Sequence, residues 1–246
     1  MKKGLVIKST GSWFSVKIEN GGIVNCRIKG KFRLKGIRTT SPVTVGDFVL
    51  IEIQEDDNGI IVEIEDRKNY IIRKSVNLSK KSHIIASNID LAFLVVTINH
   101  PKTYSNFIDR FLVSAEAYHI PTTIIFNKID LLSEEEELEL EEYIRIYSNI
   151  GYHCIKTSVE KNINIEAVMD EMKGKTSVFS GNSGVGKSSL INLIDSDMNI
   201  KTDDISDSHN QGKHTTTFAE MHELKFGGYI IDTPGIKGLG IVDIEK

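Results

Sequence analysis

The chain has 246 residues, enough for one large domain or two smaller ones with a buried core. Hydrophobic residues make up 40% and charged residues 26%, a composition that is typical of globular proteins and excludes a largely disordered chain. The net charge of −4 is unevenly spread: residues 1–50 hold ten lysines and arginines against two acidic residues, a net +8, which leaves −12 for the remainder. Such a basic segment indicates contact with a polyanion, and a solvated basic face is the alternative.

The cysteines and the apolar runs limit the cellular setting. Cys26 and Cys154 lie far apart and form no CxxC pair, which argues against a disulfide framework and against a zinc site within the chain. The N-terminus has no apolar run long enough for a signal peptide, and no stretch approaches ~20 apolar residues. We therefore expect a cytoplasmic monomer with no membrane contact.

Residues 1–68 are predicted to be β structure. Runs rich in β-branched residues occur at 5–8, 14–18, 22–28, 47–53 and 59–65, and the turn signals Asn20-Gly21-Gly22 and Asp57-Asn58-Gly59 lie between some of them. Several short strands without a helical period predict a small barrel or sandwich. Residues 69–87, which are polar and basic, are predicted to be a linker.

One segment of this β region carries much of the positive charge. From residue 27 to residue 35 cations alternate with uncharged residues, so in a strand the cations would share one face: Arg27, Lys29, Lys31, Arg33 and Lys35. A protein core cannot hold five unpaired cations, so that face must meet solvent or a polyanion. We expect it to bind RNA, with an ordinary solvated face as the alternative. Trp13 and Phe14 are candidate stacking platforms, although core packing explains either equally well.

From residue 88 onward the pattern changes to alternating strands and helices. Strands are predicted within 88–99, 122–126, 153–159, 176–180, 218–226 and 228–232, and helices within 107–120, 133–151, 164–174 and 186–194. Ser133 is a predicted helix N-cap and Gly151 a predicted helix stop. This order predicts a doubly wound, mostly parallel α/β sheet, with its sites at the carboxyl ends of the strands.

The strongest motif lies between a predicted strand and a predicted helix. Residues 181–188 match GxxxxGK[ST], a loop whose backbone N–H groups cradle the phosphates of a nucleotide. Lys187 is expected to reach the β- and γ-phosphates, and the Ser188 hydroxyl to bind Mg²⁺. The expected nucleotide-binding residues of this loop are Gly181, Asn182, Ser183, Gly184, Val185, Gly186, Lys187, Ser188 and Ser189.

A second motif predicts which base is bound. Residues 127–130 read Asn-Lys-Ile-Asp at the end of an apolar strand. The Asp130 carboxylate can accept two parallel N–H bonds from guanine, whereas adenine offers no such pair. Lys128 is expected to pack along the base and Asn127 to tie neighbouring loops together. After the next strand, Ser158 or Val159 is expected to offer a backbone N–H to the guanine oxygen.

Two further segments are candidates for contacts with the γ-phosphate. Asp232 ends a strand at Asp-Thr-Pro-Gly and can hold Mg²⁺ through water, while the N–H of Gly235 can meet the phosphate; a simple turn is the alternative. Thr215, Thr216 and Thr217 offer hydroxyls to Mg²⁺ and an N–H to the phosphate, with Thr216 the assigned ligand. His214 is expected to orient the attacking water, and an exposed loop histidine is the alternative.

The order of these motifs is unusual. In an ordinary GTPase the phosphate loop precedes the Asn-Lys-x-Asp motif, whereas here residues 127–130 precede residues 181–188. The set of motifs is intact but its ends have moved, which is a circular permutation.

This order, the basic β-rich N-terminal region and Gly-Lys-His-Thr-Thr-Thr at 212–217 resemble the ribosome small subunit-dependent GTPase A family (RsgA, also called YjeQ) over essentially the whole chain. The resemblance implies an OB-fold at 1–68, a linker at 69–87, and a circularly permuted Ras-like GTPase domain at 88–246. It implies Mg²⁺-dependent hydrolysis of GTP to GDP and phosphate, stimulated by the small (30S) ribosomal subunit and its rRNA, and a late role in 30S maturation. It also implies that His214 replaces the water-positioning glutamine of Ras-like enzymes, because Ile236 follows Asp-Thr-Pro-Gly.

One feature of the family is missing from this sequence. Members usually continue into a helical module with a Cys/His zinc site, whereas this chain ends at Lys246 without such ligands, so zinc is not predicted. Two other functions remain open on the sequence alone. One is an rRNA-binding checkpoint module in which GTP stabilises a binding-competent shape and hydrolysis is incidental. The other is a P-loop ATPase with a coincidental Asn-Lys-Ile-Asp.

Overall fold

The computed structural model describes residues 1–28, 42–55, 57–74, 82–198 and 219–232. The chain divides into two compact units, the first built on Met1–Ile89 and the second on residues from Asp90 onward, with the last two strands divided between them. Among the described residues, no helix is both long enough and apolar enough to cross a membrane.

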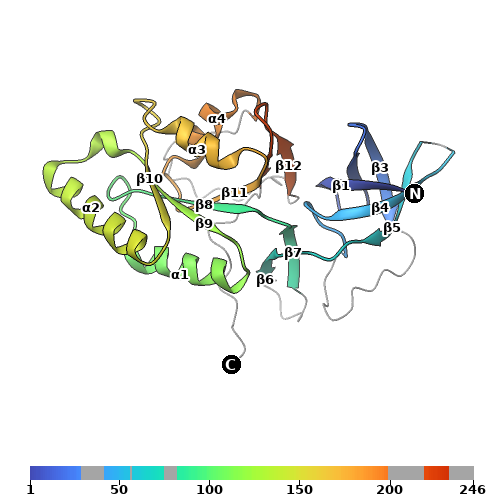
Figure 1. Cartoon of the computed structure of the whole chain (residues 1–246), viewed down its shortest axis with the longest axis horizontal. Helices are drawn as coiled ribbons and strands as arrows, with labels where there is room; N and C mark the ends of the chain where they lie inside the picture. The colour runs from blue at the N-terminus through green and yellow to red at the C-terminus, as the bar shows by residue number, and fades with distance from the viewer. Residues whose placement is uncertain (29–41, 56, 75–81, 199–218, 233–246) are drawn as a thin grey trace, which may run out of the picture. The chain divides into compact units, whose positions relative to one another are not determined.

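The first unit contains a closed barrel of five strands (Figure 1). These are β1 (Lys2–Ser9), β2 (Phe14–Ile18), β3 (Ile23–Ile28), β4 (Phe48–Ile53) and β5 (Gly59–Ile64). Their order is β1-β2-β3-β5-β4, and β4 pairs again with β1 to close the barrel. The side chains that alternate inward form one apolar core, which includes Val6, Val16, Ile51 and Ile61. This arrangement confirms the predicted OB-fold.

Two further strands follow the barrel, β6 (Tyr70–Lys74) and β7 (Ser82–Ser87), paired as an antiparallel hairpin. They lie within residues 69–87, where the sequence indicated a linker. The strands form because Ile71, Ile84 and Ala86 have a core to bury against, and all three are at most 3% exposed. The polar residues between the strands hid this short apolar pattern.

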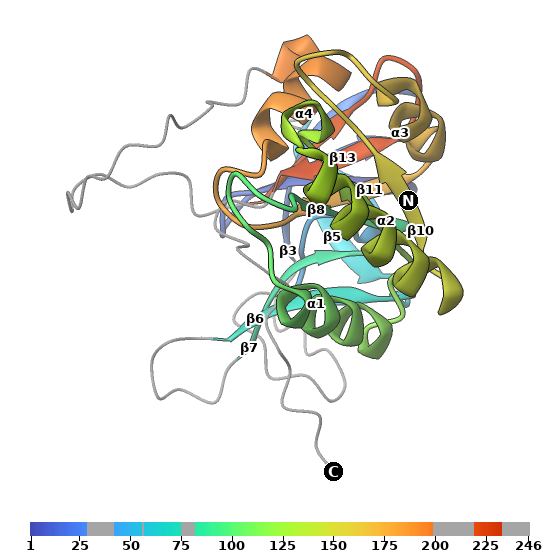
Figure 2. The ribbon, with the colours of Figure 1, turned by 90° about the vertical axis from the view of Figure 1, so that its left-hand side faces the viewer.

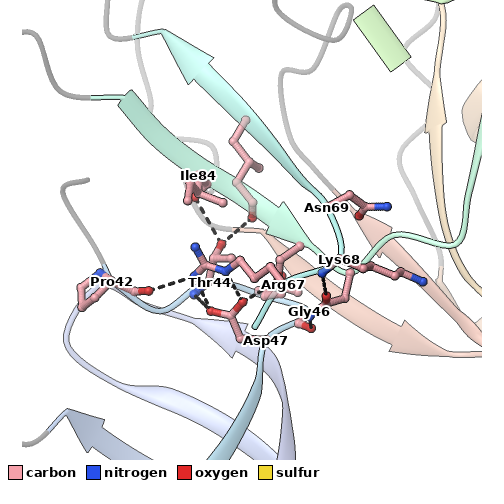
Figure 3. A network of polar contacts seen from close by, with 12 residues as sticks. Pro42, Thr44, Gly46, Asp47, Arg67, Lys68, Asn69 and Ile84 are labelled. Carbon is pink, nitrogen blue, oxygen red and sulfur yellow. Dashed lines mark hydrogen bonds and ion pairs between the residues drawn. The ribbon is translucent and has the colours of Figure 1, made fainter. Parts of the chain in front are cut away.

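The hairpin is fastened to the barrel through the turn that precedes β4. Ser87 donates its backbone N–H to the Val45 carbonyl at 3.0 Å. A Cβ on Gly46 would lie 2.1 Å from the Ser87 carbonyl oxygen, and Gly46 has a φ of +92°, so only glycine allows this approach. The Thr44 hydroxyl donates to the Ile85 carbonyl at 2.9 Å and contacts the Ile84 carbonyl at 3.2 Å (Figure 3).

A buried ion pair lies at the centre of this junction (Figure 3). The Asp47 side chain is fully buried and that of Arg67 is 7% exposed. The Arg67 guanidinium contacts both Asp47 carboxylate oxygens at 2.6 Å and donates to the Pro42 carbonyl at 2.9 Å. Asp47 also accepts from the Ser87 hydroxyl at 2.6 Å and from the Thr44 N–H at 2.8 Å. The carboxylate therefore joins the barrel, Arg67 and the hairpin.

The second unit is a sheet with helices on both faces. Its strands are β8 (Leu91–Val96), β9 (Thr122–Phe126), β10 (His153–Lys156) and β11 (Thr176–Ser180), and the same sheet includes β12 (Glu220–Glu223) and β13 (Tyr229–Asp232), each of which lies only partly in this unit. The strand order is β10-β9-β8-β11-β13-β12, and the neighbours from β10 to β11 are parallel. Every residue of β8 is buried, as a strand covered on both faces requires.

Within the described residues, four helices cover this sheet. They are α1 (Ser105–Ala117), α2 (Glu134–Asn149), α3 (Ile165–Met172) and α4 (Lys187–Ile194), with short 3₁₀ turns at Ile129–Leu131 and Ser196–Met198. Figures 1 and 2 show α3 and α4 above the sheet and α1 below it. The core between the sheet and α3 and α4 includes Phe93, Val95, Val168 and Leu190. Helix α2 lies beside α1, since the Tyr147 hydroxyl donates to Asp109 at 2.8 Å. The doubly wound sheet and the predicted N-cap Ser133 at the start of α2 are confirmed, and Ser133 also forms a capping box with Glu136.

The buried pair gives a stability prediction. Arg67→Met should destabilise the first unit by about 3 kcal/mol, because it leaves the Asp47 charge buried without a countercharge. Urea unfolding followed by the fluorescence of Trp13, the one tryptophan of the sequence, reports on this unit. The double variant Asp47→Asn/Arg67→Met should be more stable than Arg67→Met. A double variant that loses as much stability as the sum of both single variants would contradict this role.

Candidate nucleotide-binding site

The phosphate loop connects β11 to α4 and curves tightly. Gly181 has a φ of +142°, and a Cβ there would lie 2.1 Å from the Val95 carbonyl oxygen. Gly186 has a φ of +95°, and a Cβ there would lie 2.4 Å from the side-chain nitrogen of Asn127. Both positions therefore require glycine, for conformation and for space.

Lys187 closes this loop from within. Its ammonium group donates to the Gly181 carbonyl at 2.7 Å and to the Asn182 carbonyl at 2.5 Å. Helix α4 begins at Lys187 after Gly186, which has no side chain to cap the helix. The first N–H groups of α4 and the Lys187 charge thus gather where an anion binds well.

The hydroxyl residues of this loop fit a magnesium–phosphate ligand. Ser188 and Ser189 lie in the first turn of α4 and are both partly exposed. A serine hydroxyl is a hard oxygen donor of the kind that Mg²⁺ accepts beside phosphate oxygens. Ser183 is exposed, while Val185 is fully buried and anchors the loop in the core.

Asn127 ties three loops together. It follows β9, and its side chain is 3% exposed. Its amide donates to the Val185 carbonyl of the phosphate loop at 2.9 Å, and its amide oxygen accepts from the Thr157 hydroxyl at 3.0 Å. One side chain therefore connects the loops that follow β9, β10 and β11.

Lys128 makes a second link to the phosphate loop. It has a left-handed φ of +63°, and its ammonium group donates to the Gly184 carbonyl at 2.7 Å. It also donates to the carbonyl of His100, in the loop after β8, at 2.8 Å. The Lys128 stem is thereby fixed between two loops.

Asp130 is held by a residue whose side chain the sequence did not single out. The Ser158 hydroxyl donates to the Asp130 carboxylate at 2.5 Å and accepts the Lys161 N–H at 3.0 Å. The backbone N–H groups of Ser158 and Val159 were the two expected donors to guanine. The Ser158 N–H already donates to the Ile163 carbonyl at 3.3 Å. Val159 is partly buried against the core. Ser158 directly follows Thr157, which bonds to Asn127. This position in the sequence was the signal that could have predicted the contact between Ser158 and Asp130.

Several expected site residues fall outside the described part of the chain. They are His214, Thr215, Thr216, Thr217 and Gly235. Asp232 is the last residue of β13, and its side chain is not described. The cations Lys29, Lys31, Arg33 and Lys35 likewise lie outside the described residues.

The described edge of the basic segment shows one stacked pair. The Arg27 guanidinium lies 4.0 Å from the centre of the Trp13 ring, which is partly exposed. Phe14, the other candidate platform, is 1% exposed and belongs to the barrel core. Its stacking role is therefore wrong, because strand alternation turns it inward while Trp13 precedes the strand.

Two family models match this chain, each over one part of it. The family model described as RsgA GTPase matches residues 64–242, and that described as RsgA N-terminal domain matches residues 3–61. The "Small ribosomal subunit biogenesis GTPase RsgA" of Phocaeicola vulgatus is 55% identical over 244 residues, which are 99% of this chain and 79% of the relative. The protein of that name from Flavobacterium johnsoniae is 56% identical, over 98% of this chain and 75% of its own.

Two solved structures are similar over the whole fold. The crystal structure of YjeQ from Thermotoga maritima is 35% identical with a TM-score of 0.78, and the match covers 99% of this chain and 78% of that one. The structure of YloQ, described as a circularly permuted GTPase, is 31% identical with a TM-score of 0.73, covering 100% and 75% of the two chains. The two family models, the relatives more than half identical to this chain and the two similar structures show that the chain belongs to the RsgA family of GTPases.

Proposed function

We propose that this GTPase hydrolyses GTP to GDP and phosphate in the presence of Mg²⁺, that the small ribosomal subunit and its rRNA stimulate it, and that it acts late in 30S maturation. The observation that carries the nucleotide part is the attachment of the Asn-Lys-Ile-Asp segment to the phosphate loop through Asn127 and Lys128. The names of the close relatives, small ribosomal subunit biogenesis GTPases, support the ribosomal part. The proposed domains are an OB-fold at 1–68, a connection at 69–87 and the GTPase domain at 88–246.

The base side of the site selects guanine in this proposal. The Ser158 hydroxyl occupies one Asp130 oxygen and so fixes the plane of the carboxylate. A carboxylate fixed in this way can accept the two neighbouring N–H donors on the guanine edge. Lys128, held at both Gly184 and His100, packs its stem along the base.

The phosphate side binds and polarises the leaving group. The Lys187 ammonium exchanges its two carbonyl acceptors for phosphate oxygens, while the N–H groups of α4 stabilise the charge that develops on the β-phosphate. Mg²⁺, held by Ser188 with Thr216 and Asp232 as the further proposed ligands, would neutralise phosphate charge. His214 orients a water molecule whose oxygen bonds to the γ-phosphorus as the bond to the bridging oxygen breaks, which releases GDP and phosphate.

The barrel is the proposed rRNA-binding surface. Arg27 stacks on Trp13 at the edge of the basic segment, and a guanidinium on an aromatic ring presents both a charge and a flat face to a nucleic acid. Lys29, Lys31, Arg33 and Lys35 follow Arg27 in the sequence and would extend this basic surface.

Asp130 is expected to set base specificity. Asp130→Asn should lose GTP affinity and gain affinity for xanthosine triphosphate, whose 2-oxo group needs a donor. Each lost charge-assisted bond is worth about 1.5–3 kcal/mol, so the preference between the two nucleotides should reverse. Equilibrium titration with both nucleotides measures this, with Glu160→Gln, an exposed nearby charge, as the matched control. An unchanged preference for GTP would exclude Asp130 as the base-selecting residue.

The ribosomal proposal is tested by GTP turnover measured with small subunits, with large subunits and with neither. Only small subunits should raise the rate. His214→Ala should bind GTP as the wild type does but show ~100-fold lower stimulated turnover, because a positioned water is lost. Alanine at Lys29, Lys31 and Arg33 should leave unstimulated turnover intact and flatten the salt dependence of subunit binding by roughly one log–log unit per lost phosphate contact.

Three outcomes would each overturn one part of this proposal. Equal rates with both kinds of subunit would remove the small subunit as the partner. Subunit binding with wild-type salt dependence in the triple variant would place the docking surface elsewhere. Subunit binding that depends on GTP while no subunit changes the turnover rate would favour a binding checkpoint in which hydrolysis is incidental.

A further inference from the structure

The loop that follows β8 lies against the nucleotide-binding loops. It is closed on itself, because the Thr97 hydroxyl donates to the Pro101 carbonyl at 2.6 Å and the Thr103 N–H donates to the Thr97 carbonyl at 3.0 Å. Pro101 also packs beside the phosphate loop, since a Cβ on Gly184 would lie 3.4 Å from its ring. No sequence motif marked this loop as part of the site.

A carbonyl of this loop holds the lysine of the base-binding motif. The His100 oxygen accepts from the Lys128 ammonium at 2.8 Å, and the same ammonium reaches the Gly184 carbonyl at 2.7 Å. Lys128 has four rotatable side-chain bonds and a left-handed backbone, so two acceptors in fixed places decide where its stem lies. Movement of the His100 carbonyl would release one of them.

Asn99 fixes His100 and connects it to helix α2. The Asn99 side-chain oxygen accepts the His100 N–H at 3.0 Å, and its amide donates to the Glu136 carboxylate at 2.7 Å. His100 has a φ of +63°, a conformation that non-glycine residues adopt only when neighbouring contacts hold it. The Asn99 side chain supplies such a contact at the His100 N–H, and the bond to Glu136 holds Asn99 in turn.

Glu136 is itself immobilised at the start of α2. Its second carboxylate oxygen accepts the Ser133 N–H at 2.9 Å, and its own N–H donates to the Ser133 hydroxyl at 3.3 Å. The Ser133 N–H and the Asn99 amide both lower the pKa of the Glu136 carboxyl, because both donate to its charged form. The capping box involves only Ser133 and Glu136, so the bond to Asn99 is a separate link between α2 and the loop that follows β8.

We propose that Asn99 and Glu136 are positioning residues for the bound guanine nucleotide. Glu136 holds Asn99, Asn99 holds the His100 backbone, and the His100 carbonyl holds Lys128 between the base and the phosphate loop. This inference rests on the proposed binding of the base at Asn127–Asp130. Asn99 and Glu136 then contribute to nucleotide affinity without contacting the nucleotide, because they act through His100 and Lys128.

The test is a titration of the full chain with fluorescent GDP, combined with GTP turnover. Asn99→Ala should weaken GDP and GTP binding to a similar degree, roughly three- to thirtyfold, as expected for residues coupled through contact. KM should rise while kcat at saturating GTP is kept, because Asn99 does not act on the γ-phosphate. In the Lys128→Ala background the same substitution should change affinity by less than about twofold, because the residue it positions is gone.

Conservative variants separate this role from a structural one. Asn99→Asp keeps the acceptor for the His100 N–H but sets a carboxylate against Glu136, so it should bind GDP as weakly as Asn99→Ala. Glu136→Gln has one acceptor oxygen in place of two, so it can accept from either the Ser133 N–H or the Asn99 amide, and its GDP affinity should lie between those of the wild type and Glu136→Ala. Glu136→Ala should lose affinity, whereas Glu135→Ala, an exposed charge in the same helical turn, should not.

Three results would overturn the inference. They are wild-type GDP affinity in Asn99→Ala, wild-type affinity in Asn99→Asp, or full additivity of Asn99→Ala with Lys128→Ala. Titration of Asp130→Asn with guanosine and xanthosine nucleotides separates the positioning role of Asn99 from base binding at Asp130. If Asp130→Asn shifts preference to xanthosine nucleotides while Asn99→Ala has no effect, the positioning role fails and the base site stands. If Asp130→Asn leaves preference unchanged, the base site itself fails.

Discussion

The buried amide of Asn127 is the contact that joins the three loops of the candidate nucleotide site. It binds the Val185 carbonyl of the phosphate loop on one side and the Thr157 hydroxyl on the other. Its nitrogen also fills the space that a side chain at residue 186 would need, so Gly186 and Asn127 require each other. Because the amide is buried, breaking either hydrogen bond leaves a polar group without a partner. The free-energy cost of that loss holds the three loops in their relative positions.

This constraint shows how a permuted chain can keep the loops of the candidate site together. Strands β10, β9, β8 and β11 are parallel neighbours, so their carboxyl ends meet at one edge of the sheet whatever their order along the chain. The loops at that edge are then joined by side chains: Asn127 and Lys128 reach the phosphate loop, and Ser158 reaches Asp130. Covalent order therefore matters less than strand order, and moving the chain ends leaves these contacts available.

The sequence predicted those elements whose order of apolar and polar residues directly reflects which side chains are buried. The strand β8, the helix α2 and the loop before α4 were all expected, because β8 is a nearly continuous apolar run, α2 has an N-cap and a stop signal, and the loop matches a glycine-rich motif. The β6–β7 hairpin was not, since a few apolar residues separated by polar ones do not reveal a core that lies elsewhere in the chain. Phe14 shows the same limit: an aromatic residue beside a basic segment is equally consistent with core and surface until the strand register is known.

The candidate site divides in the same way. Glycines and charged residues at fixed spacing indicated the loop 181–188 and the segment 127–130, because phosphate and base chemistry restrict those positions to few residue types. The supporting contacts could not be predicted, since the Ser158 hydroxyl, the His100 carbonyl and Asn99 act through geometry that many residue types could provide. Backbone acceptors in particular leave no signature in a sequence.

The most direct measurement of the central contact is the affinity of Asn127→Ala for GDP, compared with the wild type and with Asn149→Ala, an exposed asparagine at the end of α2. If Asn127 holds the base-binding and phosphate-binding loops together, GDP affinity should fall roughly tenfold or more, because the Val185 carbonyl loses its partner. The Asn149→Ala variant should bind GDP as the wild type does. Wild-type GDP affinity in Asn127→Ala would show that the loops keep their places without this amide and would contradict its central role.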